Sequence, residues 1–168
     1  MLSVDDAQRR ILALSAPLGA ETLPVAEAAG RYLAEPIAAR RDQPPADNSA
    51  MDGFAIRFDD LPGPWAVIGE SRAGHPFGGA LGTGEAAAIS TGALVPEGAD
   101  TVLVREDARR NGDRLKLTGE GPGERGRHIR RAGGDFRAQD VLLERGRALT
   151  PGALALAISA GVGSVVVG

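Results

Sequence analysis

Apolar residues at the start of the chain recur every three or four positions, as on one face of a helix: Val4, Ala7, Ile11 and Leu14. Ser3 precedes them in the position of an N-cap, and acidic residues follow within the first turn. This pattern predicts an amphipathic helix from residue 4 to about residue 15.

The middle of the chain loses the helical period and contains short apolar runs separated by glycine and proline. Five runs have the content of strands: GFAIRF, WAVIGES, AAAIST, DTVLVRE and RLKLTG. Asn111-Gly112, between TVLVRE and RLKL, is a typical two-residue turn and predicts a hairpin there. We therefore expect a compact β-rich domain.

The end of the chain returns to a helical pattern. Thr150 is a good N-cap, Pro151 follows at the first helical position, and apolar residues continue to a glycine stop at Gly161. A helix followed by the strand GSVVVG is predicted, and because that strand runs directly into the last residue, we expect a piece of a longer protein.

These patterns predict an α+β fold in which a β-rich domain is inserted into a mixed α/β linker domain. The linker domain is expected to form from both chain ends, residues 1–40 and 138–168. The inserted domain is expected to span residues 41–137.

Composition restricts the chemistry more than the fold. The chain has 43% hydrophobic and 24% charged residues, as in ordinary soluble domains, so wholesale disorder is not expected. It has no cysteine and only two histidines, which excludes disulfides, thiolate nucleophiles and thiolate metal sites. Any metal would therefore be a hard cation on oxygen ligands, with Mg²⁺ the usual candidate beside a phosphate.

Charge is unevenly distributed along a chain of net charge −3. Residues 105–147 hold 12 of the 19 basic residues and 8 of the 22 acidic ones. This span either meets something anionic or is a solvated, arginine-rich surface. The chain has no secretory-type start and no window near the roughly 18 apolar residues of a membrane span. We expect a cytoplasmic protein without membrane or nucleic-acid partners.

The stretch DNSAMDGFA, residues 47–55, is the first candidate for chemistry. Asp47, Asn48 and Ser49 favour turns, and Asp52-Gly53 is a second turn signal, so two successive tight turns are one interpretation. The other is a binding site, because packing of nearby apolar side chains would fix Asp52 beside a glycine that a ligand can approach. Those apolar neighbours are Ala50, Met51 and Phe54.

Two later stretches are further candidates. In STGALVPEGADTVLV, Thr91 and the amides after it could donate to an anion, or the segment could simply connect two strands. In IRRAGGD, Arg130 and Arg131 suit phosphate, although such pairs also occur on ordinary surfaces. No dinucleotide fingerprint, P-loop or nucleophile elbow is present.

Taken in order, LPVAEAAGRYLAEPI, DNSAMDGFA, STGALVPEGADTVLV and IRRAGGD closely resemble the N-terminal part of the MoeA family, the molybdopterin molybdenumtransferases. The family is related to the E domain of gephyrin. The resemblance covers essentially the whole chain but only the family's first two domains. It implies a dimeric enzyme that inserts molybdate into adenylylated molybdopterin, releases AMP and requires Mg²⁺. The active site would lie between the second domain of one subunit and the third domain of the other.

The resemblance also assigns expected site residues. By motif match, Asp52 of MDG is the acidic catalytic residue and the Mg²⁺ ligand, and Thr91 of TGA is the catalytic hydroxyl. Five other residues are expected to bind substrate or shape the site: Asn48, Ser49, Gly92, Arg130 and Arg131. Where the family usually has a glutamate, this chain has Gly134, so no glutamate role is carried over.

Two functions follow from the resemblance. One is the N-terminal part of a molybdenum-insertion enzyme, inactive without the missing domains. Its expected partners are adenylylated molybdopterin, a second copy of the chain and molybdopterin adenylyltransferase. The other is a non-catalytic scaffold or dimerisation module of the same fold. The intact MDG and TGA motifs favour the first, because a scaffold has no need of a positioned carboxylate.

Overall fold

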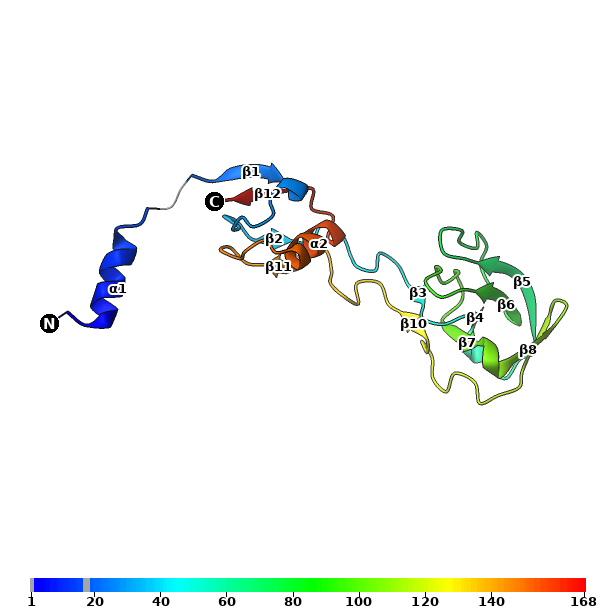
Figure 1. The fold of residues 1–168 in the computed structure, drawn as a ribbon. Coiled ribbons are helices and arrows are strands. Elements are labelled where there is room, and N and C mark those ends of the chain that lie inside the picture. The colour runs from blue at the N-terminus through cyan, green and yellow to red at the C-terminus, as the bar shows by residue number, and fades with distance from the viewer. Residues whose placement is uncertain (1, 17–18) are drawn as a thin grey trace. The chain divides into compact units, whose positions relative to one another are not determined.

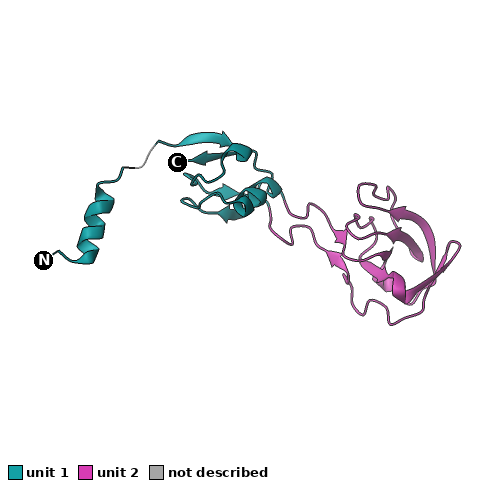
Figure 2. Ribbon diagram, viewed as in Figure 1, with its two compact units in different colours: residues 1–41, 138–168 teal, residues 42–137 magenta. Residues whose placement is uncertain are grey.

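The computed structural model describes residues 2–16 and 19–168 (Figure 1). The chain forms two compact units: unit 1 comprises residues 1–41 and 138–168, and unit 2 comprises residues 42–137 (Figure 2). Helices and strands occur together, so the predicted α+β class is confirmed. Within the described part of the chain, the helices are too short to cross a membrane.

The predicted first helix is confirmed as α1, Val4–Ala13, in unit 1. The Ser3 hydroxyl accepts a hydrogen bond from the Asp6 N–H at 3.1 Å, which satisfies one of the free donors of the first turn. No residue of α1 is buried. Its apolar face is therefore exposed, with Ile11 67% and Leu12 70% accessible.

The rest of unit 1 joins the two ends of the chain. β1, Glu21–Pro24, pairs antiparallel with β12, Ser164–Val167, and β2, Ile37–Ala38, pairs with β11, Val141–Leu143. The short helix η1, Val25–Glu27, contacts α2. The core of the unit consists of small aliphatic residues: Val25, Ala28, Leu33, Leu149, Ala157, Val165 and Val167.

The predicted second helix is α2, Pro151–Ser159. The Thr150 hydroxyl accepts from the Ala153 N–H, and Pro151 occupies the first turn, as expected from the sequence. Unlike α1, this helix buries Ala153 and Ala157. The following strand is β12, so the predicted helix-then-strand order is confirmed.

Unit 2 contains a six-stranded sheet in the order β7-β4-β6-β5-β9-β8. The bounds are β4 Gly53–Ile56, β5 Trp65–Ser71, β6 Glu85–Ile89, β7 Thr101–Val104, β8 Ala108–Asn111 and β9 Arg114–Leu117. Each of the five predicted apolar runs overlaps one of these strands. Pairing is antiparallel except between β5 and β6. Two short 3-10 helices, η2 Phe58–Asp60 and η3 Arg105–Asp107, follow β4 and β7.

Both faces of this sheet are covered. Phe54 and Ile56 of β4 pack with Trp65 and Leu103 on one face, whereas Ala55 belongs to a second apolar cluster on the other. All four residues of β4 are buried. A strand buried on both faces and bonded on both edges is held in a fixed register.

The predicted hairpin is present, but the prediction of its turn was wrong in detail. β8 and β9 pair with Asn111 opposite Arg114, so the two turn residues are Gly112 and Asp113, not Asn111-Gly112. Gly112 has φ +61°, a conformation that favours glycine at the first central position of a two-residue hairpin turn. The first strand of the hairpin is β8, and TVLV forms the separate strand β7.

Candidate functional site

The DNSAMDGFA segment lies between two other parts of unit 2. On one side, the Ser49 N–H donates to the Ala93 carbonyl at 2.9 Å, and the Gly92 N–H donates to the Ser49 carbonyl at 2.8 Å. On the other side, the Ala50 N–H donates to the His128 carbonyl at 2.8 Å. The backbone thereby brings together three motifs that are separated along the sequence.

The contact with the His128 side is part of a small strand pair. β3, Asn48–Ser49, pairs antiparallel with β10, Ile129–Arg130. The interpretation of this stretch as two successive tight turns is therefore wrong, because Asn48 and Ser49 are extended. A single bend follows them, over residues 50–52.

Ser49 shapes that bend, as predicted from the sequence. Its side chain is buried, donates to the Met51 carbonyl at 2.6 Å and accepts from the Met51 N–H at 3.3 Å. Met51 itself is 39% exposed, so the expectation that its packing would orient Asp52 was wrong. Of the apolar residues expected to fix Asp52, Phe54 is buried in the core of the sheet.

Gly53, which follows Asp52, allows β4 to approach β7 closely. A Cβ at this position would lie 2.0 Å from the carbonyl oxygen of Leu103, so no larger residue fits while β4 and β7 keep their spacing. The Asp52 carbonyl also accepts from the Arg105 N–H at 3.1 Å. The backbone of Asp52 is therefore held by the edge of the main sheet.

The side chain of Asp52 is held by Thr91. Its Oδ1 accepts hydrogen bonds from the Thr91 N–H at 2.7 Å and from the Thr91 hydroxyl at 3.1 Å. The backbone bond from Thr91, then its hydroxyl, and then the positive charge of Arg105 hold the pKa of Asp52 below its usual value. The carboxylate is therefore ionised at neutral pH. Within the described chain, only Oδ1 receives these bonds, which leaves Oδ2 available to a ligand.

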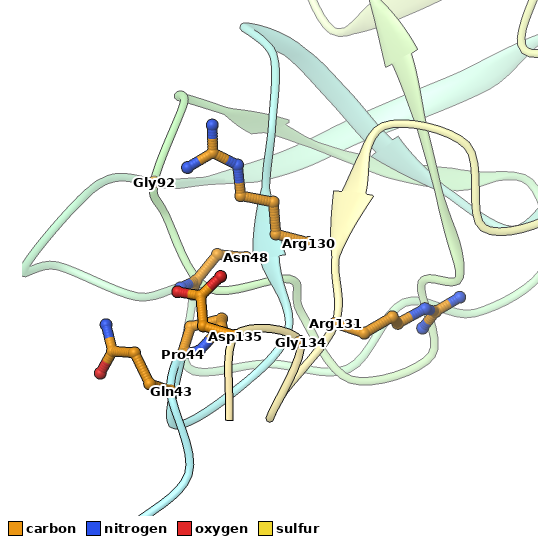
Figure 3. Close-up of a pocket in the computed structure, with 8 residues that line it drawn as sticks. All are labelled: Gln43, Pro44, Asn48, Gly92, Arg130, Arg131, Gly134 and Asp135. Carbon is orange, nitrogen blue, oxygen red and sulfur yellow. The ribbon is translucent and has the colours of Figure 1, made fainter. Parts of the chain in front are cut away.

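A pocket of about 430 Å³ lies beside this pair and is lined by Gln43, Pro44, Asn48, Gly92, Arg130, Arg131, Gly134 and Asp135 (Figure 3). Four of the predicted substrate-binding residues line it, whereas Ser49 is buried and is not part of the lining. Gly92, which lines the pocket, follows Thr91 directly along the chain, so the pocket lies next to the residue that holds Asp52. Gly92 has φ +80°, a conformation that strongly favours glycine.

The two arginines of the IRRAGGD motif differ. Arg131 donates to Asp47 at 2.5 Å, and its side chain points away from the others in the pocket (Figure 3). Arg130 forms no such pair with the described residues. Arg130 is therefore the cation of this pocket that can bind an anion, while Arg131 joins two segments of its wall.

Asp47 accepts the hydrogen bonds that connect these two segments. Burial by itself would raise the pKa of Asp47, but the Ala132 N–H, bound at 2.8 Å, and the Arg131 guanidinium together lower it below its usual value. The carboxylate thus bridges β3 to the loop after β10. The bridge adds to the backbone bonds that join the same two segments, from the Gly133 N–H to the Pro44 carbonyl and from the Asp135 N–H to the Gln43 carbonyl.

Asn48 and Asp135 supply the remaining polar groups. The Oδ1 atom of Asn48 is buried and has no hydrogen-bond donor among the described residues. Buried acceptors are normally satisfied, so this atom favours a donor from a bound molecule or water. Asp135, which the sequence reasoning did not select, lines the same pocket and is held through its N–H to the Gln43 carbonyl at 2.8 Å. Its place directly after Gly133-Gly134 was the signal that could have identified it.

A metal would have a limited ligand set here. Across residues 2–16 and 19–168, no three acidic or imidazole side chains converge as a metal cage. Two carboxylates are near the pocket: Asp52, which keeps one oxygen free of the Thr91 bonds, and Asp135, which lines the pocket. Mg²⁺ is commonly held by one or two carboxylates together with substrate phosphates and water, so this donor set fits Mg²⁺ only when a phosphate is bound.

Comparison with known proteins gives consistent matches. The MoeA N-terminal region (domain I and II) model matches residues 2–161. The molybdopterin molybdenumtransferase of Haemophilus influenzae is 40% identical over 168 residues, covering 98% of this chain and 41% of the relative. That of Synechococcus elongatus is 40% identical over 159 residues, covering 90% and 39%.

A solved structure also matches. The crystal structure of the molybdopterin biosynthesis MoeA protein from Pyrococcus horikoshii superimposes with a TM-score of 0.87 at 32% identity, covering 97% of this chain and 43% of that one. The chain thus spans about two fifths of the length of these relatives.

Proposed function

The chain belongs to the MoeA family, over the family's N-terminal region, and from this premise we propose that it supplies one wall of a site that inserts molybdate into adenylylated molybdopterin and releases AMP. The relatives named above carry the name molybdopterin molybdenumtransferase. The observation that carries the proposal is the Asp52 carboxylate, which Thr91 holds beside a pocket containing the unpaired Arg130.

The side chains have distinct proposed roles. Thr91 orients Asp52 by two hydrogen bonds to Oδ1, so Oδ2 faces the substrate in a single direction. Arg130 binds the phosphate or molybdate oxyanion, because a guanidinium matches tetrahedral oxyanions in charge and geometry. Asp52 holds Mg²⁺ when a substrate phosphate is present, and the bound ion would offset phosphate charge.

Asn48 and Asp135 are the proposed acceptors of the pocket. Each can take a hydrogen bond from the substrate, Asn48 through its buried Oδ1 and Asp135 through its carboxylate. A pocket that combines one cation with two acceptors discriminates between oxyanions alone and a larger substrate that carries N–H or O–H donors. We propose that it binds the larger substrate.

We further propose a division of roles between the chain segments. Residues 1–40 and 138–168 form a linker and dimerisation domain, and residues 41–137 form an inserted domain that carries the MDG and TGA motifs. The site is completed by domains that this chain does not contain, so the chain alone does not turn over. Its proposed partners are a second copy and molybdopterin adenylyltransferase, in the cytoplasm.

The test uses this chain joined to the remaining domains of a relative. Asp52→Asn removes the ionised carboxylate at nearly constant volume, and we expect molybdenum insertion to fall by about 100-fold or more. Asp113→Asn, which changes an exposed carboxylate in the hairpin turn, is the matched control and should leave the rate unchanged. Insertion is measured as AMP release and as activity of a molybdoenzyme supplied with the product.

The outcomes separate the two candidate functions. Insertion at the normal rate by Asp52→Asn would contradict the site assignment, whereas no insertion by the unsubstituted joined protein would favour the scaffold alternative. Turnover by residues 1–168 alone would contradict the proposal that other domains complete the site.

A further inference from the structure

The β8–β9 hairpin presents a row of cations to solvent. Arg109 of β8 lies opposite Lys116 of β9, and Asn111 lies opposite Arg114, so all four side chains project from the same face. All four residues are exposed. We call Arg109, Arg114 and Lys116 the basic hairpin face.

These cations have no counter-charge. Other arginines of unit 2 form ion pairs, whereas Arg130 of the candidate pocket forms none with the described residues. These pairs include Arg57 with Asp60, Arg72 with Glu70, Arg125 with Asp59 and Asp100, Arg127 with Glu124 and Arg131 with Asp47. By contrast, the side chains of the basic hairpin face make no hydrogen bond or ion pair with any part of the chain that the structure describes. Among the residues that the structure describes, the side chain of the neighbouring Arg110 bonds only to the Gly112 carbonyl of its own turn.

This arrangement is unfavourable for the isolated hairpin. Like charges directly opposite each other on neighbouring strands are destabilising, and Arg109 opposite Lys116 is such a pair. The packing of unit 2 does not require them, because the buried side of β9 is formed by Leu115. An external anion would relieve the repulsion.

The face is also concave. A cavity of about 300 Å³ is lined by Arg109, Asn111, Arg114, Lys116 and Thr118. A second cavity, of about 500 Å³, shares Arg114, Lys116 and Thr118 and continues to residues 62–64. Together they form a groove along the outward side of β9, next to β8, which is an edge strand of the sheet.

We propose that the basic hairpin face docks a short acidic segment of a partner protein. The net negative charge of unit 2 favours a short acidic segment over a long polyanion as the ligand. Residues 42–137 hold 15 acidic and 12 basic residues, so the unit as a whole repels an extended polyanion such as a nucleic acid. A short acidic segment can contact the three cations without extending over the rest of this net-acidic unit. This docking surface is independent of the pocket beside Asp52.

The test is a binding titration of the isotope-labelled 168-residue chain with a short glutamate-rich peptide at low salt, followed by NMR. We expect shifts confined to β8, β9 and residues 62–64, and weaker binding as salt is added. The variant Arg109→Glu, Arg114→Glu, Lys116→Glu should lose affinity by about tenfold or more. A milder variant with glutamine at the same three positions should lose most of that affinity while keeping the fold.

The matched control carries the same change in net charge elsewhere. Arg10, Arg145 and Arg147 are exposed, and their replacement by glutamate should leave peptide affinity within about twofold. Equal loss in this control would overturn the proposal, because attraction would then be non-specific. Tighter binding of a single-stranded oligonucleotide than of the peptide would also overturn it. So would stronger self-association of the glutamine variant than of the unsubstituted chain in sedimentation, since the cations would then serve only to keep edge strands apart.

Discussion

The two units of this chain reach stability in different ways. In unit 2, β4 is hydrogen-bonded to β6 on one side and β7 on the other, and both its faces are buried. In unit 1, the strands form separate two-stranded pairs, and each pair joins segments from opposite ends of the chain. The candidate site lies entirely in the unit with the continuous sheet.

This difference between the two units explains why unit 2 can hold a carboxylate in a fixed orientation. Asp52 immediately precedes β4, so its backbone takes the geometry of a strand that cannot shift by one residue without exposing its buried face. The orientation of a residue beside β1 or β2 would depend on a single two-stranded pair, formed between segments from opposite ends of the chain. A fixed orientation of this kind is what a site needs for catalysis or selective binding.

The largest expected effect comes from separating the units. Residues 42–137 produced alone should keep their fold, because their sheet and both apolar clusters are contained within that range. Deleting residues 138–168 from the full chain should unfold unit 1, since β1 and β2 lose their partners. Dispersed amide NMR signals of each product are the measurement. Collapse of the isolated 42–137 spectrum would remove the basis for the comparison.

A matched pair of core substitutions should have the next largest effect. Leu103 in unit 2 and Leu149 in unit 1 are both fully buried, and replacing either by alanine should cost about 3 kcal/mol of unfolding free energy in its own unit. The chain has one tryptophan, the buried Trp65 of unit 2, so its fluorescence follows that unit alone.

In urea, Leu103→Ala should therefore lower the midpoint of the Trp65 transition, and Leu149→Ala should leave it in place. An equal shift with both variants would mean that the two units unfold as one.

Capping residues give a smaller effect. Thr150→Ala should cost unit 1 about 1 kcal/mol, because α2 packs against the unit and its fraying exposes buried Ala153. Ser3→Ala removes the same kind of bond from α1, which has no buried residue, so the stability of unit 1 should not change. Amide exchange rates in β1 and β12 report the difference, and equal acceleration in both variants would contradict it.

The smallest effect is a titration. Because the folded-state pKa of Asp52 is lowered, its favourable contacts are complete above the unfolded pKa and are lost as pH falls through the folded value. Thr91→Ala removes the hydroxyl donor but keeps the N–H donor, so the pKa of Asp52 should rise only part of the way to its usual value. Carboxyl ¹³C shifts measure this, and an unchanged midpoint would show that the hydroxyl contributes nothing.

Local patterns in the sequence were sufficient for much of the fold. Thr150 and Pro151 identified the start of α2, and the run WAVIGES coincides with β5. The hairpin was correct in place but displaced by one residue at its turn, because the positive φ falls on Gly112 at the first turn position. Turn chemistry is local, but its register depends on the strands that flank it.

The candidate site was harder to predict because it is assembled by long-range backbone bonds. The contact of Ser49 with Gly92 and the pairing of β3 with β10 join segments about 40 and 80 residues apart, which no local period encodes. Family motifs named Asn48, Gly92 and Arg130, which the structure brings to one pocket. They did not indicate the engagement of Arg131 with Asp47, or the presence of Asp135 in the same wall.

The pairing of β1 with β12 also has a mechanical consequence. Its register places Glu21 next to Val167 and Pro24 next to Ser164, so the outward ends of both strands lie side by side. Tension applied to those outward ends would load the bonds one at a time, as in opening a zipper. Backbone bonds also join Val166 to Ala34 and Gly168 to Tyr32, so residues 32–34 would share the load, and residues 42–137 would carry no force until these bonds open as well. Under load, this strand pair is a release element that shields the sheet and the carboxylate of Asp52 from strain.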